Sequence, residues 1–217
     1  MDYLDVLYSR SSKPQTQYVS QYVRFLIKEF SLVNSSSLLE LGSGNCDVLS
    51  EFQSHGFKVT GLDNCPSSGN DHDVAVLQHD LNLPLPFADC TFDIVFNKSL
   101  VEHLPDPSIV FLESYRVLKP GGKLIIMTPD WEVQMRKFYD DWTHKTPFTI
   151  YTMKNLSSLA QFSSNSSIKY FKQLPLLWKF PLLSLISNII APFIPVRTQS
   201  KLRWLRERQI LACLVKP

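Results

Sequence analysis

The sequence is short of glycine, net charge and paired cysteines, and each shortage narrows the class of protein. Only seven of the 217 residues are glycine, and two of them, Gly42 and Gly44, stand one residue apart. The formal net charge is +2, so bulk electrostatics argue neither for nor against nucleic acid as a partner. No internal repeat is visible, and this length suits one α/β domain with a sizeable core. The four cysteines have no metal-ligand spacing, so we expect free thiols in a reducing compartment and no metal site.

Long unbroken hydrophobic runs are also missing. The most apolar stretch, residues 180–196, has no charge but contains Pro181, Pro192 and Pro195. A membrane-spanning helix needs about twenty apolar residues without such breaks, so a spanning segment is excluded there. The first five residues include two acids where a signal peptide requires bases, so we expect no export and a cytoplasmic location.

The segment from Leu38 to Asp47 has the order strand, tight turn, helix. An apolar run ends in an acid, two glycines spaced by one residue follow, and an amphipathic segment comes next. Gly42 and Gly44 let the backbone turn sharply and let a ligand approach without meeting a Cβ. A ligand here would lie at the carboxyl end of the first strand, beside a helix N-terminus. Open α/β sheets bind nucleotide-like cofactors at that place.

Two classes of cofactor use such a turn, and the acids separate them. A dinucleotide fingerprint has a third glycine or alanine three residues after Gly44, where this chain has Asp47. Glu40 adds a second negative charge before the glycine pair. Both acids disfavour a pyrophosphate and favour a cation such as S-adenosylmethionine, which carries a sulfonium and an amino group but no phosphate. A nicotinamide oxidoreductase is therefore disfavoured.

Strands and helices alternate along most of the chain. This order predicts a mostly parallel sheet with right-handed crossovers. We expect an N-terminal helical segment over residues 1–35, with a helix from Pro14 to Phe30, and little helix in the polar loop from Asn64 to Asp73. The core spans 36–173, an apolar and basic helical insertion spans 174–208, and a last strand spans 209–215. The other strands are predicted at 38–41, 57–63, 74–80, 92–97, 123–129 and 168–172.

Several short motifs stand in a fixed order along this core. They are Glu40–Cys46, Pro84–Phe87 before the fourth strand, Glu102–Leu104 after it, and Leu118–Gly122 before the fifth. With the acids that end the first three strands, the ordered set resembles the class I S-adenosylmethionine-dependent methyltransferases. The resemblance is to the type 11-like group, which includes quinone-, sterol- and sugar-modifying enzymes, and it covers about residues 36–162.

The resemblance implies a fold and a cofactor. The fold is Rossmann-like and doubly wound, with a mostly parallel seven-stranded sheet whose last strand is antiparallel. The cofactor is S-adenosylmethionine and its product is S-adenosylhomocysteine. Glu40 would face the methionine amino end, and the backbone of Gly42 and Gly44 would pass close to the cofactor. The family often has a third glycine where this chain has Cys46.

The resemblance also assigns residues at the later strand ends. Asp63 would accept hydrogen bonds from both ribose hydroxyls, since two carboxylate oxygens match two adjacent donors. Asp80 would accept from the adenine amino group, with the backbone of Leu81 near the ring. Asn97, just past the fourth strand, would offer its carbonyl to the ammonium. The alternative is that these are solvated polar groups at strand ends.

Methyl transfer asks little of side chains beyond position, desolvation and sometimes a base. His103 and His144 are the catalytic candidates, with Asp141 as a residue that could orient His144. The run from Asp141 to Phe148 resembles a pattern in bacterial members linked to glycan or lipid modification. The alternatives are that His103 is a structural histidine with its hydrogen bonds satisfied, and that His144 belongs to a turn whose conformation is fixed by proline.

The insertion over 174–208 has three interpretations. Its apolar part is followed by Arg197, Lys201, Arg203 and other basic residues, with Trp204 among them. Apolar surface beside a basic, tryptophan-bearing segment is typical of peripheral membrane contact. The segment could instead form helices that cover the sheet and the acceptor pocket, or a contact between two copies.

The function predicted from sequence is S-adenosylmethionine-dependent methyl transfer, at oxygen, to a small-molecule or lipid- or glycan-linked acceptor. Nucleic acid is not expected, because no broad basic surface or RNA-binding appendage is present. The alternative is a catalytically inactive S-adenosylmethionine-binding scaffold or regulatory subunit. A monomer and a homodimer both remain open.

Overall fold

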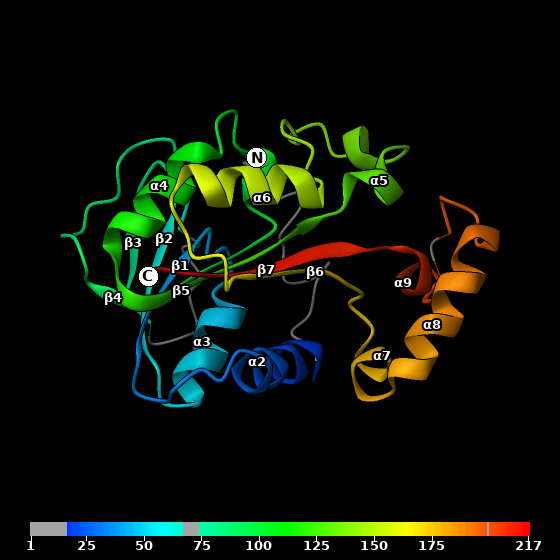
Figure 1. Ribbon diagram of the computed structural model, residues 1–217, viewed down its shortest axis with the longest axis horizontal. Helices are drawn as coiled ribbons and strands as arrows, with labels where there is room; N and C mark the ends of the chain where they lie inside the picture. The colour runs from blue at the N-terminus through cyan, green and yellow to red at the C-terminus, as the bar shows by residue number, and fades with distance from the viewer. Residues whose placement is uncertain (1–16, 67–73, 199) are drawn as a thin grey trace.

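The computed structural model describes residues 17–66, 74–198 and 200–217, which form a doubly wound α/β fold around one sheet (Figure 1). The strand order is β3-β2-β1-β4-β5-β7-β6, with β7 antiparallel to both of its neighbours and the other pairs parallel. The predicted seven-stranded, mostly parallel sheet with an antiparallel last strand is confirmed. The strands are β1 (Ser37–Leu41), β2 (Lys58–Asp63), β3 (Val76–Gln78), β4 (Phe92–Lys98), β5 (Leu118–Pro129), β6 (Ser167–Phe171) and β7 (Gln209–Val215).

Helices cover both faces of the sheet (Figure 1). Successive strand residues point to opposite faces, so Leu38 and Leu39 of β1 belong to different halves of the core. The half that contains Leu38 packs against α2 (Gln17–Glu29) and α3 (Asp47–Ser54). The half that contains Leu39 packs against α4 (Ser108–Val117) and α6 (Ile150–Leu159). The central strands are buried on both sides, as an apolar run such as that of β4 requires.

The start of β5 differs from the prediction. The fifth strand was predicted to begin at residue 123, after Leu118–Gly122, but β5 already begins at Leu118. Leu118 pairs with Phe92, and the register shifts before Lys123 pairs with Ile94. The intervening residues form an irregularity inside the strand, with Gly121 at a φ of 76°.

Two sequence predictions extend beyond the described residues. The first helix is observed as α2, while Pro14 and residues 1–13 lie outside the described part. In the crossover after Asp63, residues 64–66 contain no helix. Residues 67–73 lie outside the described part of the chain.

The insertion leaves the sheet at the edge where the parallel strands end. It begins after β6 and returns at the first residue of β7, Gln209, which pairs with Pro129 at the carboxyl end of β5. α7 packs on α2, with the Trp178 ring 5.0 Å from that of Phe25. α8 packs on α7, α9 and η3 and extends beyond the sheet edge (Figure 1). The elements are α7 (Pro175–Lys179), α8 (Pro181–Ile190), η3 (Ala191–Phe193) and α9 (Arg203–Arg206).

Trp178 of α7 also stacks on Phe171 of β6, with ring centroids 5.3 Å apart, whereas Leu182 and Ile189 of α8 are exposed. Among the residues that the structure describes, no helix is both long and apolar enough to cross a membrane.

Candidate functional site

The loop between β1 and α3 has a backbone that only a few residue types accept. Gly42 and Gly44 have φ values of 72° and 49°, in the left-handed region that favours glycine. A Cβ on Gly42 would lie 3.1 Å from the Leu100 side chain, and one on Gly44 would enter open space. Cys46 has a φ of 62°, so the family's third glycine falls where the backbone is again left-handed. The glycine turn that the sequence predicted is therefore present.

Asp63, at the end of β2, fastens this loop. Its Oδ2 accepts the backbone N–H of Gly44 at 2.8 Å, and its Oδ1 accepts that of Cys65 at 2.9 Å. A carboxylate oxygen can accept more than one hydrogen bond, so both oxygens keep capacity for a ligand. The predicted ribose-binding acid is thus already positioned by the protein backbone.

A cavity of about 750 Å³ opens at the carboxyl ends of β1, β2 and β4. Its lining brings together five of the residues predicted from sequence, namely Glu40, Gly42, Gly44, Asp63 and His103. Trp142 and Lys145, from the segment between β5 and α6, also line it, and the Trp142 side chain is 79% exposed. The cavity is therefore bounded by the cofactor loop on one side and by the predicted acceptor-side segment on the other.

Four predicted residues do not line this cavity. Asp80 is exposed, and its Oδ1 accepts hydrogen bonds from the backbone and side chain of Asn82, which lower its pKa. Leu81 is buried in the core. Asn97 lies inside β4 and not past its end, because the strand continues to Lys98. His144, the fourth, lies behind His103.

Glu40 gives the cavity its electrostatic character. Its side chain is buried, and burial raises its pKa well above the usual range. Lys98 opposes this rise, while Asp63 and Asp47 add to it. A cation placed beside Glu40 would restore its charged form, because an opposite charge favours ionisation.

Lys98 lines the same cavity and was missed in the sequence. Its ammonium also lies 5.8 Å from the ring centroids of Tyr18 and Tyr22 on α2. The signal that could have found it is a lysine directly after the buried run of β4, at the edge where the ligand was expected.

Two buried polar atoms of residues that line this cavity, the Oε2 of Glu40 and the hydroxyl of Ser43, have no hydrogen-bond partner among the described residues. Both amide atoms of Asn97, inside β4, are in the same situation. Buried polar groups are normally hydrogen-bonded, so such atoms at a cavity fit a ligand that supplies donors. The carboxylate oxygens of Glu40 and Asp63 can accept hydrogen bonds from the amino group and the ribose hydroxyls of S-adenosylmethionine. A pyrophosphate would instead meet the negative charge of these acids.

The histidines form a hydrogen-bonded group with the segment after β5. The Thr143 hydroxyl donates to Asp141 Oδ1 at 2.6 Å and therefore accepts from His103 Nδ1 at 2.8 Å. This assigns the proton of neutral His103 to Nδ1 and leaves a lone pair on Nε2. Burial and the neighbouring His144 lower the pKa of His103, so the ring is neutral at neutral pH. His103 is thus held in the form that a base requires.

His144 supports His103 from behind. Its Nδ1 is 2.6 Å from the carbonyl of Phe138, and its ring centroid lies 4.7 Å from that of His103. Asp141 Oδ2 lies 3.8 Å from His144 Nε2, so the carboxylate that was expected to orient His144 bonds Thr143 more closely.

Glu102 lies next to the histidine pair and is almost fully buried. Its Oε2 accepts the Thr128 hydroxyl at 2.9 Å, and its Oε1 has no hydrogen-bond partner in the described part of the chain. Glu102, His103 and His144 each bring one ligand atom within 4.8 Å of the others, so this group could hold a metal ion. The sequence predicted no metal; Glu102 and His103 are neighbours in the short helix η1 (Val101–His103), and His144 joins them only through the packing of the segment after β5.

Comparison with known proteins agrees with this fold. Residues 39–126 match the family model described as a methyltransferase domain. Over 138 residues the chain is 28% identical to the 2-methyl-6-phytyl-1,4-hydroquinone methyltransferase of Synechocystis sp., covering 52% of this chain and 42% of the relative. Over 84 residues it is 31% identical to phosphoethanolamine N-methyltransferase 2 of Caenorhabditis elegans, covering 37% and 18%. The chain spans less than half the length of these curated relatives.

The fold also matches a solved methyltransferase. The phosphoethanolamine N-methyltransferase 2 of Haemonchus contortus, in complex with phosphomonomethylethanolamine and S-adenosylhomocysteine, aligns with a TM-score of 0.72 at 16% identity. The alignment covers 100% of this chain and 59% of that one. The fold is the Rossmann-like one of the methyltransferases. Over residues 39–126 the chain is similar to the methyltransferase domain family, and its fold is that of the class I S-adenosylmethionine-dependent methyltransferases.

Proposed function

We propose that this protein transfers a methyl group from S-adenosylmethionine to an oxygen of a small-molecule or lipid- or glycan-linked acceptor. The observation behind this proposal is that Glu40 and Asp63, from different strands, face one cavity beside a glycine turn. Relatives with the same domain are named for methylation of a hydroquinone and of phosphoethanolamine, which supports a small acceptor. The absence of a broad basic surface in the sequence supports the same class.

The cavity residues divide the cofactor among them. Asp63 holds the ribose hydroxyls, and Glu40 faces the amino group of the methionine part. Lys98, on the same wall, binds the methionine carboxylate, because an ammonium pairs with a carboxylate at short range. Asp80 and Leu81, which follow β3, bind the adenine from the rim. Asn97 remains the proposed partner of the ammonium.

The reaction needs one proton to be removed. When bound, S-adenosylmethionine would supply a methyl group on a positively charged sulfur; the acceptor oxygen would take the methyl, and the electron pair of the broken carbon–sulfur bond would stay with S-adenosylhomocysteine. The Nε2 lone pair of His103 takes the hydroxyl proton of the acceptor. Thr143 and Asp141 keep His103 in the required tautomer. Trp142 and Lys145 shield the reacting groups from water at the cavity mouth.

The alternative from another class is a protein that binds the cofactor without transferring the methyl. Calorimetry with S-adenosylmethionine, followed by detection of S-adenosylhomocysteine over a wide acceptor panel, separates the two. We expect binding and, with a hydroxyl-bearing acceptor, turnover. No binding at millimolar cofactor would remove both proposals, and binding without turnover would favour the scaffold.

The proposed place of action is the cytoplasm, at a membrane surface. A lipid-linked acceptor would be met there, and the apolar insertion leaves the sheet at the same edge as the cavity. The monomer and the homodimer both stay open in this proposal.

A further inference from the structure

Helix α8 is amphipathic, but its apolar side faces solvent. Leu182, Leu185, Ile186, Ile189 and Ile190 recur at steps of three and four residues, which places them on one side of the helix. All five are exposed, with Leu182 at 75% and Ile189 at 70%. Phe193 of η3 continues this side and is 83% exposed. We call these six side chains the α8 face.

The polar side of α8 is the one that faces the protein. Ser187 is only 2% exposed, and its hydroxyl accepts a hydrogen bond from the buried Lys172 ammonium at 2.8 Å. Lys172 also donates to the carbonyl of Leu205 on α9 at 2.7 Å. Arg206 of α9 donates to the carbonyl of Ile194 at 2.7 Å. These bonds fix the rotation of α8, so the outward direction of its apolar side is part of the fold.

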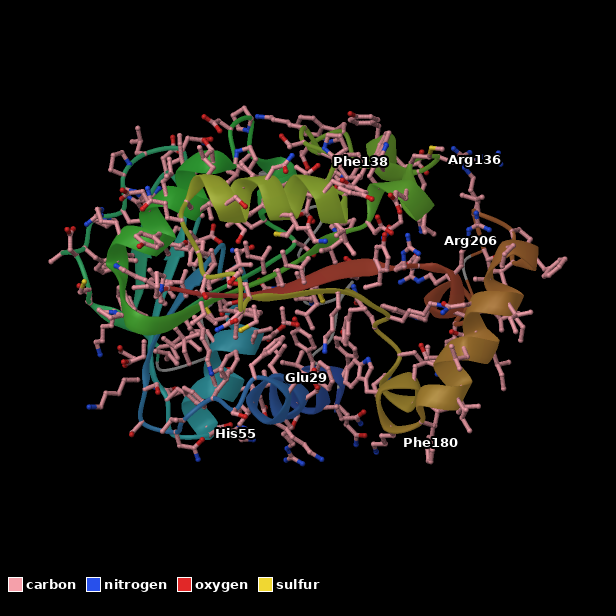
Figure 2. All side chains as sticks on the ribbon, in the orientation of Figure 1. Glu29, His55, Arg136, Phe138, Phe180 and Arg206 are labelled. Carbon is pink, nitrogen blue, oxygen red and sulfur yellow. The ribbon has the colours of Figure 1, made fainter. Side chains whose placement is uncertain are left out.

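The surroundings of the α8 face carry positive charge. From Trp142 to Arg206 the sequence has nine Lys or Arg residues and no Asp or Glu. Lys179, Lys201 and Arg203 of this stretch are exposed, and the exposed Arg197 pairs with Asp140 at 3.3 Å. Figure 2 shows Phe180, which precedes α8, pointing away from the body of the protein. Such a surface is complementary to an anionic membrane: the apolar face suits the acyl-chain boundary, and the basic border suits the headgroups.

The position of the face relates it to the cavity. The insertion leaves β6 and enters β7 beside Pro129, at the carboxyl end of β5. The cofactor cavity lies at the carboxyl ends of β1, β2 and β4, on the same edge of the sheet. A surface bound to the α8 face would therefore lie at the end of the molecule where the cavity is.

We infer that the α8 face docks on an anionic lipid bilayer, with its six apolar side chains in the interfacial layer and the basic residues beside them on lipid phosphates. A second copy of the chain fits less well, because a two-fold contact would set the same cations against each other. A bilayer supplies the opposite charge. The docking itself requires no cofactor and so stands apart from methyl transfer.

Sedimentation with vesicles tests this inference. The full chain should bind phosphatidylcholine vesicles that contain phosphatidylglycerol and bind pure phosphatidylcholine at least about tenfold less, with binding that falls as salt rises. The variant Leu182→Gln/Ile189→Gln/Phe193→Gln keeps the charge and should lose at least about tenfold in affinity. Lys201→Gln/Arg203→Gln should lose about fivefold for each removed cation.

A matched control separates binding by the α8 face from non-specific adsorption through other exposed apolar residues. Val33→Gln/Leu159→Gln replaces two apolar residues outside the insertion that are 69% and 57% exposed, and it should bind vesicles like the wild type. S-adenosylmethionine titration of each variant shows whether the cofactor site is intact. Wild-type protein that stays in solution with anionic vesicles overturns the inference. So does equal binding by the triple variant, or a dimer that the triple substitution dissolves without any vesicle binding.

Discussion

Asp63 accepts a hydrogen bond from the backbone N–H of Gly44 at 2.8 Å, and this bond joins the end of β2 to the turn that ends β1. The same carboxylate accepts the N–H of Cys65 on its other oxygen. One acid thus fixes the turn and presents its remaining lone pairs to the cavity. A residue with both duties should have a larger effect on cofactor binding than an acid that only touches the ligand.

The first prediction compares Asp63 with Asp80. Asp63→Ala should weaken S-adenosylmethionine binding by about tenfold or more, since hydrogen bonds to a charged group contribute about 1.5–3 kcal/mol. Asp80→Ala should weaken it less, because Asp80 is exposed and already bonded to Asn82. Calorimetry measures both affinities, and thermal unfolding without cofactor controls for loss of fold. An equal or reversed order would contradict the assignment.

The second prediction concerns Lys98. Lys98→Met removes the charge but keeps most of the side-chain volume. Affinity for S-adenosylhomocysteine should fall by about tenfold or more, since the carboxylate loses a charged partner. Affinity for 5′-methylthioadenosine, which has no carboxylate, should change little. If both ligands lose affinity equally, Lys98 supports the cavity wall and does not bind the carboxylate.

The sequence predicted the sheet well because its signals are local and ordered. Buried parallel strands read as apolar runs, and acids or glycines mark their ends, as in β1 and β2. Glu40, Gly42, Gly44 and Asp63 could be placed in one cavity because the carboxyl ends of parallel strands share an edge. The start of β5 was wrong because the irregularity inside that strand depends on its pairing with β4, which no local pattern encodes.

Other parts of the site depend on how distant segments pack. His103 and His144 were both candidates in the sequence, and only the packing of the segment after β5 shows that His103 lines the cavity and His144 does not. The direction of α8 could not be predicted either. An amphipathic pattern normally turns its apolar side to the core, and the buried bond from Lys172 to Ser187 reverses that expectation.

The third prediction concerns the base. His103→Gln should lower turnover by about 10²–10⁴-fold with little effect on cofactor affinity, because general bases contribute a factor of that order. Thr143→Val removes the acceptor that fixes the His103 tautomer and should lower turnover less. Single-turnover rates of both variants are measured with an acceptor identified in the acceptor panel described above. Rates at the wild-type level in His103→Gln would show a structural histidine.

The pH profile gives an independent test of the same base. His103 acts only when neutral, and its pKa is lowered by burial and by His144. The rate should therefore fall as pH decreases through a value below about 6.5, the ordinary pKa of histidine. This fall in rate at low pH should disappear in His103→Gln. If the rate still falls at low pH in this variant, the fall is due to another titratable group.

The fourth prediction is that the reaction proceeds without a metal. Chelation followed by dialysis should leave turnover unchanged, because the Nε2 lone pair of His103 suffices as the base. Elemental analysis of the purified protein should show no stoichiometric metal. The opposite result, a bound ion lost together with activity and restored with it, would make Glu102, His103 and His144 ligands.

The fifth prediction concerns Glu102 and stability. Burial raises its pKa to about 7 in the folded protein, against the ordinary value of 4.5. The folded state therefore holds the Glu102 proton more tightly than the unfolded state. The stability due to this group is full below pH 4.5 and is lost as pH rises through about 7. The total change corresponds to about 3 kcal/mol.

Comparison with Glu102→Gln isolates this contribution. Glutamine keeps an oxygen to accept the Thr128 hydroxyl but does not titrate. A buried group that does not act on Glu102, such as Glu40, contributes equally to both proteins and cancels in the difference. Urea titrations between about pH 4 and pH 8 should show the free energy of unfolding of the wild type falling relative to the variant. Parallel curves would mean that folding does not raise the pKa of Glu102.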